Sequence, residues 1–332
     1  MLIQLVPRLR NGGVCDFAYK LQASIGQDAV RLVHLSKENA ADWKIDPEDS
    51  VVLQMSGYGF DERGAPLWLL HEIEKRRKHI KTLGVFFHEL YAFGPPWTSS
   101  FWLSPVQRHI ARRLAEMSDF WMTSREGSAQ WLRRYVQDKP QAVLPVFSTI
   151  GEPDSFAQVR LPRIVVFGSA GLRHATYQAA GDKLFAWAKQ ASLEIHDIGA
   201  PVTDGQVAVT LHANGVIQHG RLDDREIGRL MQDALFGLLA YPVDYVAKSS
   251  VFAAYCAHGM CPILISRSYV QEDGLIARVH YLPGVPNAVA AERAEIIGRT
   301  AWVWYQPHNL SHHAAFINSA INGANNGVGH DA

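Results

Sequence analysis

Short apolar runs alternate with longer amphipathic stretches along the chain, and this alternation restricts the fold more than any other feature of the sequence. Runs rich in Val, Ile, Leu and Phe predict buried strands in the first half. They are Leu2–Val6, Ala29–His34, Val51–Met55, Thr82–His88, Phe120–Thr123 and Ala142–Val146. The stretches between them predict helices at Gly13–Ala23, Pro66–His79, Ser104–Met117 and Arg125–Gln137. Such alternation favours a mostly parallel sheet with helices on both faces.

The same alternation begins again after Ile150–Ser155, a stretch that we interpret as a linker. The strands predicted beyond it are Ile164–Gly168, Leu193–Ile198, Val216–Gln218, Leu235–Tyr241 and Pro262–Ile265. The predicted helices are His174–Lys189, Asp224–Gln232, Ser250–His258 and Asn287–Trp304. We therefore expect two α/β domains, 1–150 and 151–305. A short helix, Ala315–Ile321, and a flexible tail are expected within 306–332.

Composition excludes several classes of protein. Lys and Arg total 32, as do Asp and Glu, so the chain lacks the positive charge of a general nucleic-acid binder. Hydrophobic residues make up 48%, which is globular rather than disordered. The three cysteines form no CxxC pattern and are expected to be buried free thiols. No apolar run approaches the roughly 18 residues of a membrane span. We expect a soluble, cytoplasmic protein.

Ligands of parallel α/β sheets bind beyond the carboxyl ends of the strands, so the residues that follow each predicted strand are candidates. Two domains would present two such edges to one cleft. Gly12 and Gly13 follow the first strand. Two glycines let the backbone approach a ligand closely, and the helix that follows favours an anion at its N-terminus. A plain tight turn is the alternative.

His88 and Glu89 leave an apolar strand at the corresponding edge of the first domain. An imidazole at this position could polarise a hydroxyl or donate a hydrogen bond to a sugar. A structural histidine whose hydrogen bonds are already satisfied is the competing interpretation.

The residues after strand Leu235–Tyr241 give the best local signal. Ser249 or Ser250 can cap the helix that follows. The first-turn amides, the helix dipole and the cation of Lys248 would then converge on a phosphate. An ordinary capped helix with a solvated lysine is the alternative.

Arg173 follows the strand Ile164–Gly168 and a short loop. A guanidinium at this position could bind a diphosphate in forked geometry. The alternative is an ordinary charge on a helix surface.

The order of these pieces resembles the retaining, nucleotide-sugar-dependent glycosyltransferases of group 1 (family 4-like), which have the GT-B fold with two Rossmann-like domains. The resemblance extends over residues 2–310. The motifs that carry it are Gly12–Ala18, His88, Ser118–Arg125, Arg163–Gly168 with Arg173, His219–Leu222 with Glu226, and Pro242–Pro262.

The resemblance implies transfer of a sugar from a nucleotide diphosphate to an acceptor hydroxyl with retention, and without a metal or other cofactor. His88 would face the sugar and the acceptor, and the nucleotide base would lie near Arg221 and Leu222. The residues that would bind the donor and its diphosphate are Gly12, Gly13, Arg173, Lys248, Ser249 and Ser250.

One departure from the family concerns its usual pair of glutamates in the second domain. Val246 and Ala254 occupy the corresponding positions, so both carboxylates are absent. Asp244 is the nearest substitute for the glutamate that touches the donor sugar. Two alternatives to a transferase therefore stay open. One is a non-catalytic GT-B-like subunit or glycan-binding partner, and the other is a nucleotide-sugar epimerase.

The expected partners are a nucleotide sugar and a glycan or lipid-linked acceptor, with no nucleic acid. The basic run Lys75–His79 is first interpreted as the solvated carboxyl end of a helix. Together with exposed Trp residues, it could also hold the protein peripherally at the inner membrane surface.

Overall fold

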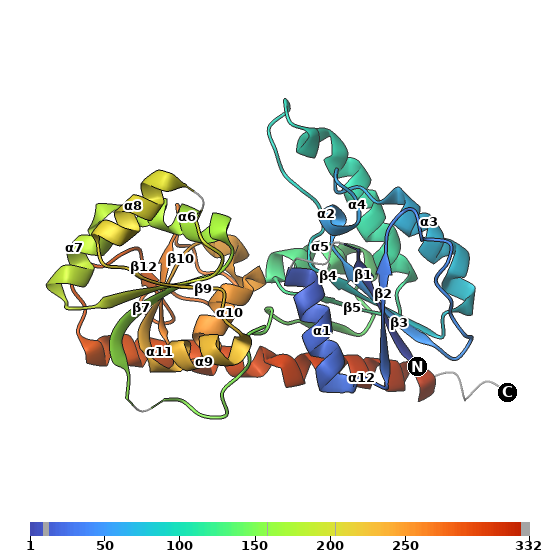
Figure 1. Ribbon diagram of the computed structural model, residues 1–332. Coiled ribbons are helices and arrows are strands. Elements are labelled where there is room, and N and C mark those ends of the chain that lie inside the picture. Colours follow the sequence, from blue (N-terminus) through green and yellow to red (C-terminus); the bar gives the residue numbers. More distant parts are fainter. Residues whose placement is uncertain (9–12, 158, 203, 327–332) are drawn as a thin grey trace. The chain divides into compact units, whose positions relative to one another are not determined.

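The computed structural model describes residues 1–8, 13–157, 159–202 and 204–326 (Figure 1). The chain divides into two compact units. Unit 1 comprises Met1–Pro145 and Leu310–Ala332, and unit 2 comprises Val146–Asn309. The boundary therefore follows Pro145, whereas the sequence placed it at residue 150. The C-terminal segment belongs to unit 1.

Unit 1 is built on a parallel six-stranded sheet with the strand order β2-β1-β3-β4-β5-β6. Its strands are β1 (Leu2–Pro7), β2 (Val30–Leu35), β3 (Ser50–Met55), β4 (Thr82–Phe87), β5 (Phe120–Thr123) and β6 (Gln141–Val143). Its helical segments are α1 (Gly13–Ile25), α2 (Gly57–Phe60), α3 (Leu67–Arg76), η1 (Arg77–His79), α4 (Ser99–Met117), α5 (Glu126–Val136) and α12 (Leu310–Asn326).

Helices cover both faces of this sheet, which explains why its strands are continuous apolar runs rather than alternating ones. Ile3 and Leu5 of β1 belong to one core cluster with residues of α3, α4 and α5. The next residue along a strand points to the opposite face. On that face the ring of Phe86 lies 5.0 Å from the ring of Phe17 in α1 and 5.9 Å from that of His313 in α12.

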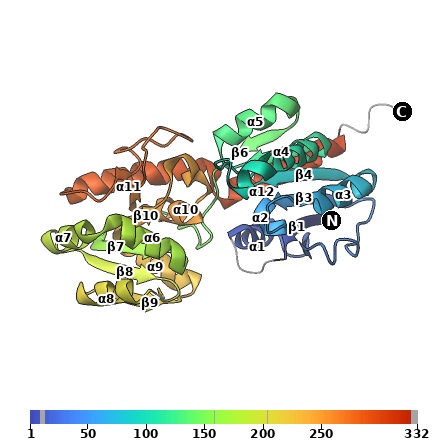
Figure 2. The ribbon, with the colours of Figure 1, turned by 90° about the horizontal axis from the view of Figure 1, so that it is seen from above.

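Unit 2 repeats the plan with a second parallel sheet, in the order β12-β11-β10-β7-β8-β9. Its strands are β7 (Leu161–Phe167), β8 (Glu194–Ile198), β9 (Ile217–Gly220), β10 (Ala234–Ala240), β11 (Cys261–Ile265) and β12 (Leu282–Pro283). Its helical segments are α6 (Ala170–Ala180), α7 (Asp182–Gln190), α8 (Gly205–Ala213), α9 (Asp224–Asp233), η2 (Val243–Lys248), α10 (Ser250–Ala257), α11 (Ala291–Tyr305) and η3 (Gln306–His308). Figure 2 shows β10, β7, β8 and β9 in this order.

The helices differ from their predicted ranges where local signals compete. The predicted helix His174–Lys189 is divided into α6 and α7 by Gly181, whose φ of +55° ends α6. Helix α4 begins at Ser99 and continues through Pro105, although proline favours a helix start. Helix α12 is longer than the predicted Ala315–Ile321. Its packing against α1 and β4 outweighs the weak helix propensity of its Gly and Asn residues.

Two predictions from composition can be compared with the structure. Cys15, Cys256 and Cys261, all within the described residues, are buried thiols outside any disulfide, as predicted. None of the helices in the described residues combines the length and the hydropathy that crossing a bilayer requires.

Candidate functional site

The carboxyl ends of three neighbouring strands of unit 2 converge at one edge of its sheet. Gly168 follows β7, and a Cβ on it would lie 3.4 Å from Cγ2 of Val251 in the first turn of α10, which follows β10. Gly199 follows β8, and a Cβ on it would lie 2.4 Å from the carbonyl oxygen of Gly168. Both glycines have positive φ, +130° and +146°. Only glycine fits this packing, which brings the start of α10 beside the loops after β7 and β8.

The start of α10 has the geometry that the sequence predicted for its cap. Ser249 is the N-cap, and its Oγ accepts a hydrogen bond of 3.2 Å from the amide of Phe252. Ser249 is buried, while Ser250 is half-buried at the first helical position. The amides of Ser250 and Val251 have no acceptor within the helix because they belong to its first turn. They are the groups that an anion would meet here.

Lys248 and Asp244 lie in η2, immediately before this cap, and both are half-buried. The Lys248 Nζ lies 5.7 Å from the centre of the Tyr245 ring. The structure thus brings Lys248, Ser249 and Ser250 together at one point of the edge, with Asp244 on the preceding turn.

Helix α6 supplies a second N-terminus at this edge, which sequence reasoning did not single out. Ser169 is its N-cap and accepts a hydrogen bond of 3.3 Å from the amide of Leu172. The Gly168-Ser169 pair directly after a buried strand was the available signal. Two helices therefore begin at the ends of the adjacent strands β7 and β10, and both dipoles favour an anion there.

Arg173 is not placed to bind a ligand, and the prediction that it binds a diphosphate is wrong for this structure. Its side chain has no solvent exposure and forms an ion pair with buried Asp197. Its Nε donates to the Gly168 carbonyl at 3.1 Å, and its Nη2 donates to the Ala200 carbonyl. Arg173 instead ties the loop after β7 to the loop after β8.

Arg221 and Leu222 follow β9, the edge strand, and Arg221 is exposed whereas Leu222 is half-buried. The amide of Gly199 donates to the carbonyl of Gly220 at 2.9 Å, so the ends of β8 and β9 are joined. The two predicted base-proximal residues therefore lie at the same sheet edge as the two helix starts. The next helix, α9, begins with an Asp223 capping box.

The two positions without the family glutamates lie in the core. Val246 is 1% exposed and Ala254 is 0% exposed. The carbonyl oxygen of Ala254 forms a hydrogen bond of 2.8 Å with the ring Nδ1 of His258. Buried apolar side chains thus occupy both positions at which the resemblance implies carboxylates.

His88 of unit 1 lies just beyond β4 in a row of buried polar side chains that crosses three strands. Its Nε2 is 2.9 Å from Oε1 of Gln54, whose Nε2 donates to Oε1 of Gln4 at 2.7 Å. Gln4 in turn donates to the carbonyl of Ala18 in α1 at 3.3 Å. The contact to Gln54 fixes the orientation of the His88 imidazole, and which of the two side chains donates depends on the histidine tautomer.

The surroundings of His88 have features of a structural histidine and also of one that could contact a ligand. The imidazole is 8% exposed, and its centre lies 4.3 Å from that of the Phe86 ring. The neighbouring Glu89 is half-buried and accepts a hydrogen bond of 3.5 Å from Ser56, which follows β3. At the end of β1, Gly13 begins α1 with open space around it. Gly12 lies outside the described residues.

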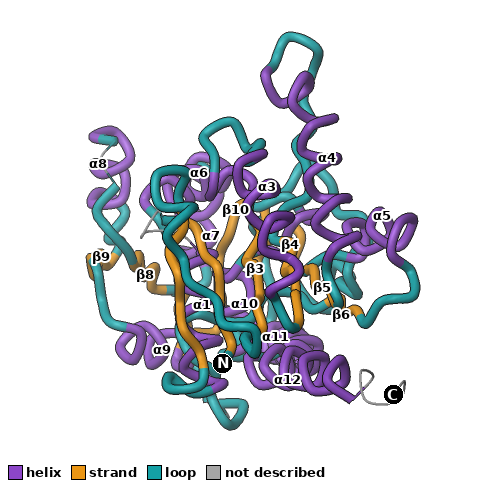
Figure 3. Tube along the Cα trace, turned by 90° about the vertical axis from the view of Figure 1, so that its right-hand side faces the viewer, coloured by secondary structure: helices purple, strands orange, loops and turns teal. Residues whose placement is uncertain are grey.

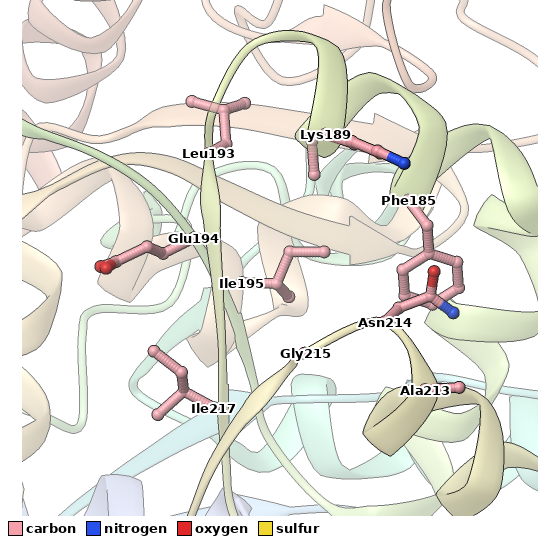
Figure 4. A pocket seen from close by; sticks show the side chains of 10 residues that line it. Phe185, Lys189, Leu193, Glu194, Ile195, Ala213, Asn214, Gly215 and Ile217 are labelled. Carbon is pink, nitrogen blue, oxygen red and sulfur yellow. The ribbon is translucent and has the colours of Figure 1, made fainter.

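A hollow of about 500 Å³ lies at the other edge of the second sheet (Figure 4). It is lined by Phe185, Ala188, Lys189, Leu193, Glu194, Ile195, Ala213, Asn214, Gly215 and Ile217. These residues come from α7, from the end of α8, from the amino ends of β8 and β9, and from the turns that precede these two strands. Because α/β sheets bind ligands at their carboxyl edge, we do not assign this hollow to the site.

The described residues contain no group of three or more His, Cys, Asp or Glu side chains arranged to hold a metal ion. The two helix starts and Lys248 contribute positive charge at the carboxyl edge of unit 2, where Arg221 and Asp244 also lie.

Comparison with known proteins gives a match in structure alone. No family model matches the sequence, and no curated protein sequence matches it. The chain is similar to the pneumococcal O-GlcNAc transferase GtfA, solved in complex with UDP and GlcNAc. The TM-score is 0.56 at 11% identity, over 89% of this chain and 60% of that enzyme. This chain thus spans about three fifths of the enzyme's length.

Two other solved structures are similar to this chain, one over nearly its full length and one over three fifths of its length. AviGT4, a glycosyltransferase involved in Avilamycin A biosynthesis, matches with a TM-score of 0.54 at 10% identity, over 98% of each chain. A chain of the GtfA/B complex matches with a TM-score of 0.53 at 13% identity, over 87% of this chain and 60% of that one. At such identities the likeness shows the fold. The two parallel six-stranded sheets form the GT-B fold, as the sequence resemblance implied.

Proposed function

We propose that this protein transfers a sugar from a nucleotide-diphosphate donor to an acceptor hydroxyl. The observation that carries the proposal is the convergence of two capped helix starts and Lys248 at the carboxyl edge of unit 2. The structures that share the fold support it, because they are glycosyltransferases and one was solved with UDP and GlcNAc.

The donor diphosphate would bind at this edge of unit 2. Negative charge grows on the diphosphate as the bond to the sugar breaks, and groups fixed in advance stabilise that charge most effectively. The amides of Ser250 and Val251 and the cation of Lys248 would meet it, with the base near Arg221 and Leu222. We propose retention of the anomeric configuration and no requirement for a metal.

The acceptor, a glycan or a lipid-linked sugar, would bind to unit 1 with His88 and Glu89 near its hydroxyl. The fixed orientation of the His88 imidazole suits this role, because a positioned acceptor or donor of a proton loses little entropy in the reaction. Asp244 of unit 2 is the carboxylate that we propose to contact the donor sugar.

A non-catalytic subunit is the second candidate, and the burial of Val246 and Ala254 favours it. A chain without the glutamate pair could bind a partner transferase or a glycan and release no nucleoside diphosphate. One structure of similar fold comes from a GtfA/B complex. Slow hydrolysis of a nucleotide sugar without acceptor would favour the transferase, and nucleotide binding without any hydrolysis would favour the subunit.

Lys248→Ala is expected to weaken the binding of a nucleoside diphosphate about tenfold, because one charge-assisted contact to the phosphate is lost. Calorimetric titration with UDP, GDP, ADP and TDP measures the affinity and identifies the base. Lys183→Ala is the matched control, since Lys183 is an exposed lysine on α7. Equal affinities of Lys248→Ala and the unmodified protein would remove Lys248 from the proposed site.

A further inference from the structure

The start of α4 and the loop before it stand out from the rest of unit 1 (Figures 1 and 3). Large aromatic side chains of this segment face solvent: Phe93 is 68% exposed, Trp97 84%, Phe101 42% and Trp102 68%. We call these four residues the aromatic tip. Soluble proteins rarely gather exposed aromatics in so short a segment unless the surface binds something.

Hydrogen bonds inside the loop use its polar groups and leave an apolar outer surface. Nε1 of Trp102 donates to the carbonyl of Pro96 at 2.8 Å. The Thr98 hydroxyl donates to the carbonyl of Pro95 at 2.8 Å, and the Ser100 hydroxyl donates to that of Thr98 at 3.3 Å. The tip is therefore held in shape by its own loop, which lowers the entropy cost of binding.

The segment that carries the tip contains basic but no acidic residues. No Asp or Glu occurs from Leu90 to Ala115, whereas Arg108 and His109 are exposed on α4. The Arg108 guanidinium stacks 4.4 Å from the centre of the Tyr91 ring. It lies six residues beyond Trp102, which is about 9 Å along a helix. This depth matches the roughly 5–10 Å to which interfacial aromatic side chains enter a bilayer.

The basic run Lys75–His79 fits a membrane surface less well than the sequence suggested. Arg76 forms an ion pair with Glu72, and Arg77 forms one with Asp119 at 2.6 Å. Arg77 also donates to the carbonyls of Met117 and Ile80. These contacts neutralise part of the run and fix it to unit 1.

We propose that the aromatic tip inserts into the interfacial layer of an anionic bilayer, with Arg108 at the level of the lipid phosphates. Trp is suited to this layer, and a cation behind the aromatic side chains complements anionic headgroups. The inference rests on the exposed side chains and charges of unit 1, and it holds whether or not the proposed transfer reaction is correct.

Co-sedimentation of the full chain with vesicles tests the proposal. We expect binding to phosphatidylcholine vesicles that contain about one third phosphatidylglycerol, and much weaker binding to pure phosphatidylcholine. Trp97→Ser/Trp102→Ser is expected to reduce the partition coefficient about tenfold or more. Arg108→Gln is expected to reduce it about fivefold at low salt, and less at high salt.

A matched control removes exposed apolar side chains elsewhere. Val209→Ser/Ile296→Ser replaces residues of unit 2 that are 69% and 54% exposed, and it should leave the partition unchanged. Circular dichroism spectra identical to that of the unmodified protein establish that the variants fold. Absence of vesicle binding, or equal binding by the tip variant, would overturn the proposal. If the tip variant instead changed the oligomeric state in sedimentation velocity, the tip would belong to a contact between copies of the chain.

Discussion

Arg173→Met is expected to lower the free energy of unfolding by about 3–5 kcal/mol, because it leaves the carboxylate of Asp197 buried without its cation. Asp197 is 2% exposed, and its other described partner is the Tyr177 hydroxyl, which donates to it at 2.9 Å. Burial and the neighbouring Asp197 raise the pKa of Tyr177 well above its usual value. The phenol therefore stays protonated and still donates its hydrogen bond to Asp197, but it supplies no positive charge.

Urea unfolding followed by circular dichroism measures the change. Arg163→Met is the matched control, because Arg163 pairs with Glu194 at 2.8 Å in a partly exposed ion pair that should contribute less than about 1 kcal/mol. Adding Asp197→Asn to Arg173→Met should recover part of the loss, since no buried charge then remains. An Arg173→Met protein of normal stability that had lost nucleotide binding would restore Arg173 to the phosphate site.

The prediction for Arg173 was wrong because the position of a residue after a strand does not determine the direction of its side chain. The residue does follow a strand at the ligand edge, but helix phase decides where its side chain points. Arg173, Thr176, Tyr177 and Ala180 are spaced three, four and seven residues apart and form the buried face of α6. That spacing was visible in the sequence. Arginine is rarely buried completely, so the spacing alone does not predict that Arg173 belongs to the buried face.

Predictions that depend only on residues close together in the sequence agree with the structure better than the prediction for Arg173. The Ser249 cap depends on residues within three positions, and it occurs as predicted. The strands followed from apolar runs because parallel sheets are covered on both faces. The row Gln4, Gln54 and His88 could not be predicted in this way, since it depends on the register between β1, β3 and β4.

The structure gives a physical reason for the absence of the glutamate pair, because both positions are buried. A glutamate at Val246 or Ala254 would place a carboxylate where the side chain is almost completely buried. Without a partner, such a carboxylate is costly to ionise. The core of unit 2 is therefore adapted to apolar residues at both positions. In the proposed reaction, Asp244 therefore takes the role of contacting the donor sugar.

His88→Ala is expected to reduce turnover at least about 100-fold while leaving the affinity for nucleoside diphosphates unchanged, if the protein transfers sugars as proposed. The substitution removes the imidazole that Gln54 orients just beyond β4, next to Glu89 in the chain. Release of nucleoside diphosphate from a panel of nucleotide sugars measures turnover without knowledge of the acceptor. Calorimetry measures the affinity.

The control for this experiment must separate chemistry from stability, because His88→Ala also removes the hydrogen-bond partner of the buried Gln54 side chain. That loss alone should cost about 1–3 kcal/mol of stability. Gln54→Leu breaks the same row but keeps the imidazole. We expect it to be destabilised to a similar extent, with turnover within about tenfold of the unmodified protein. Equal losses of turnover in both variants would show that the row as a whole supports the fold. His88 would then be a structural histidine.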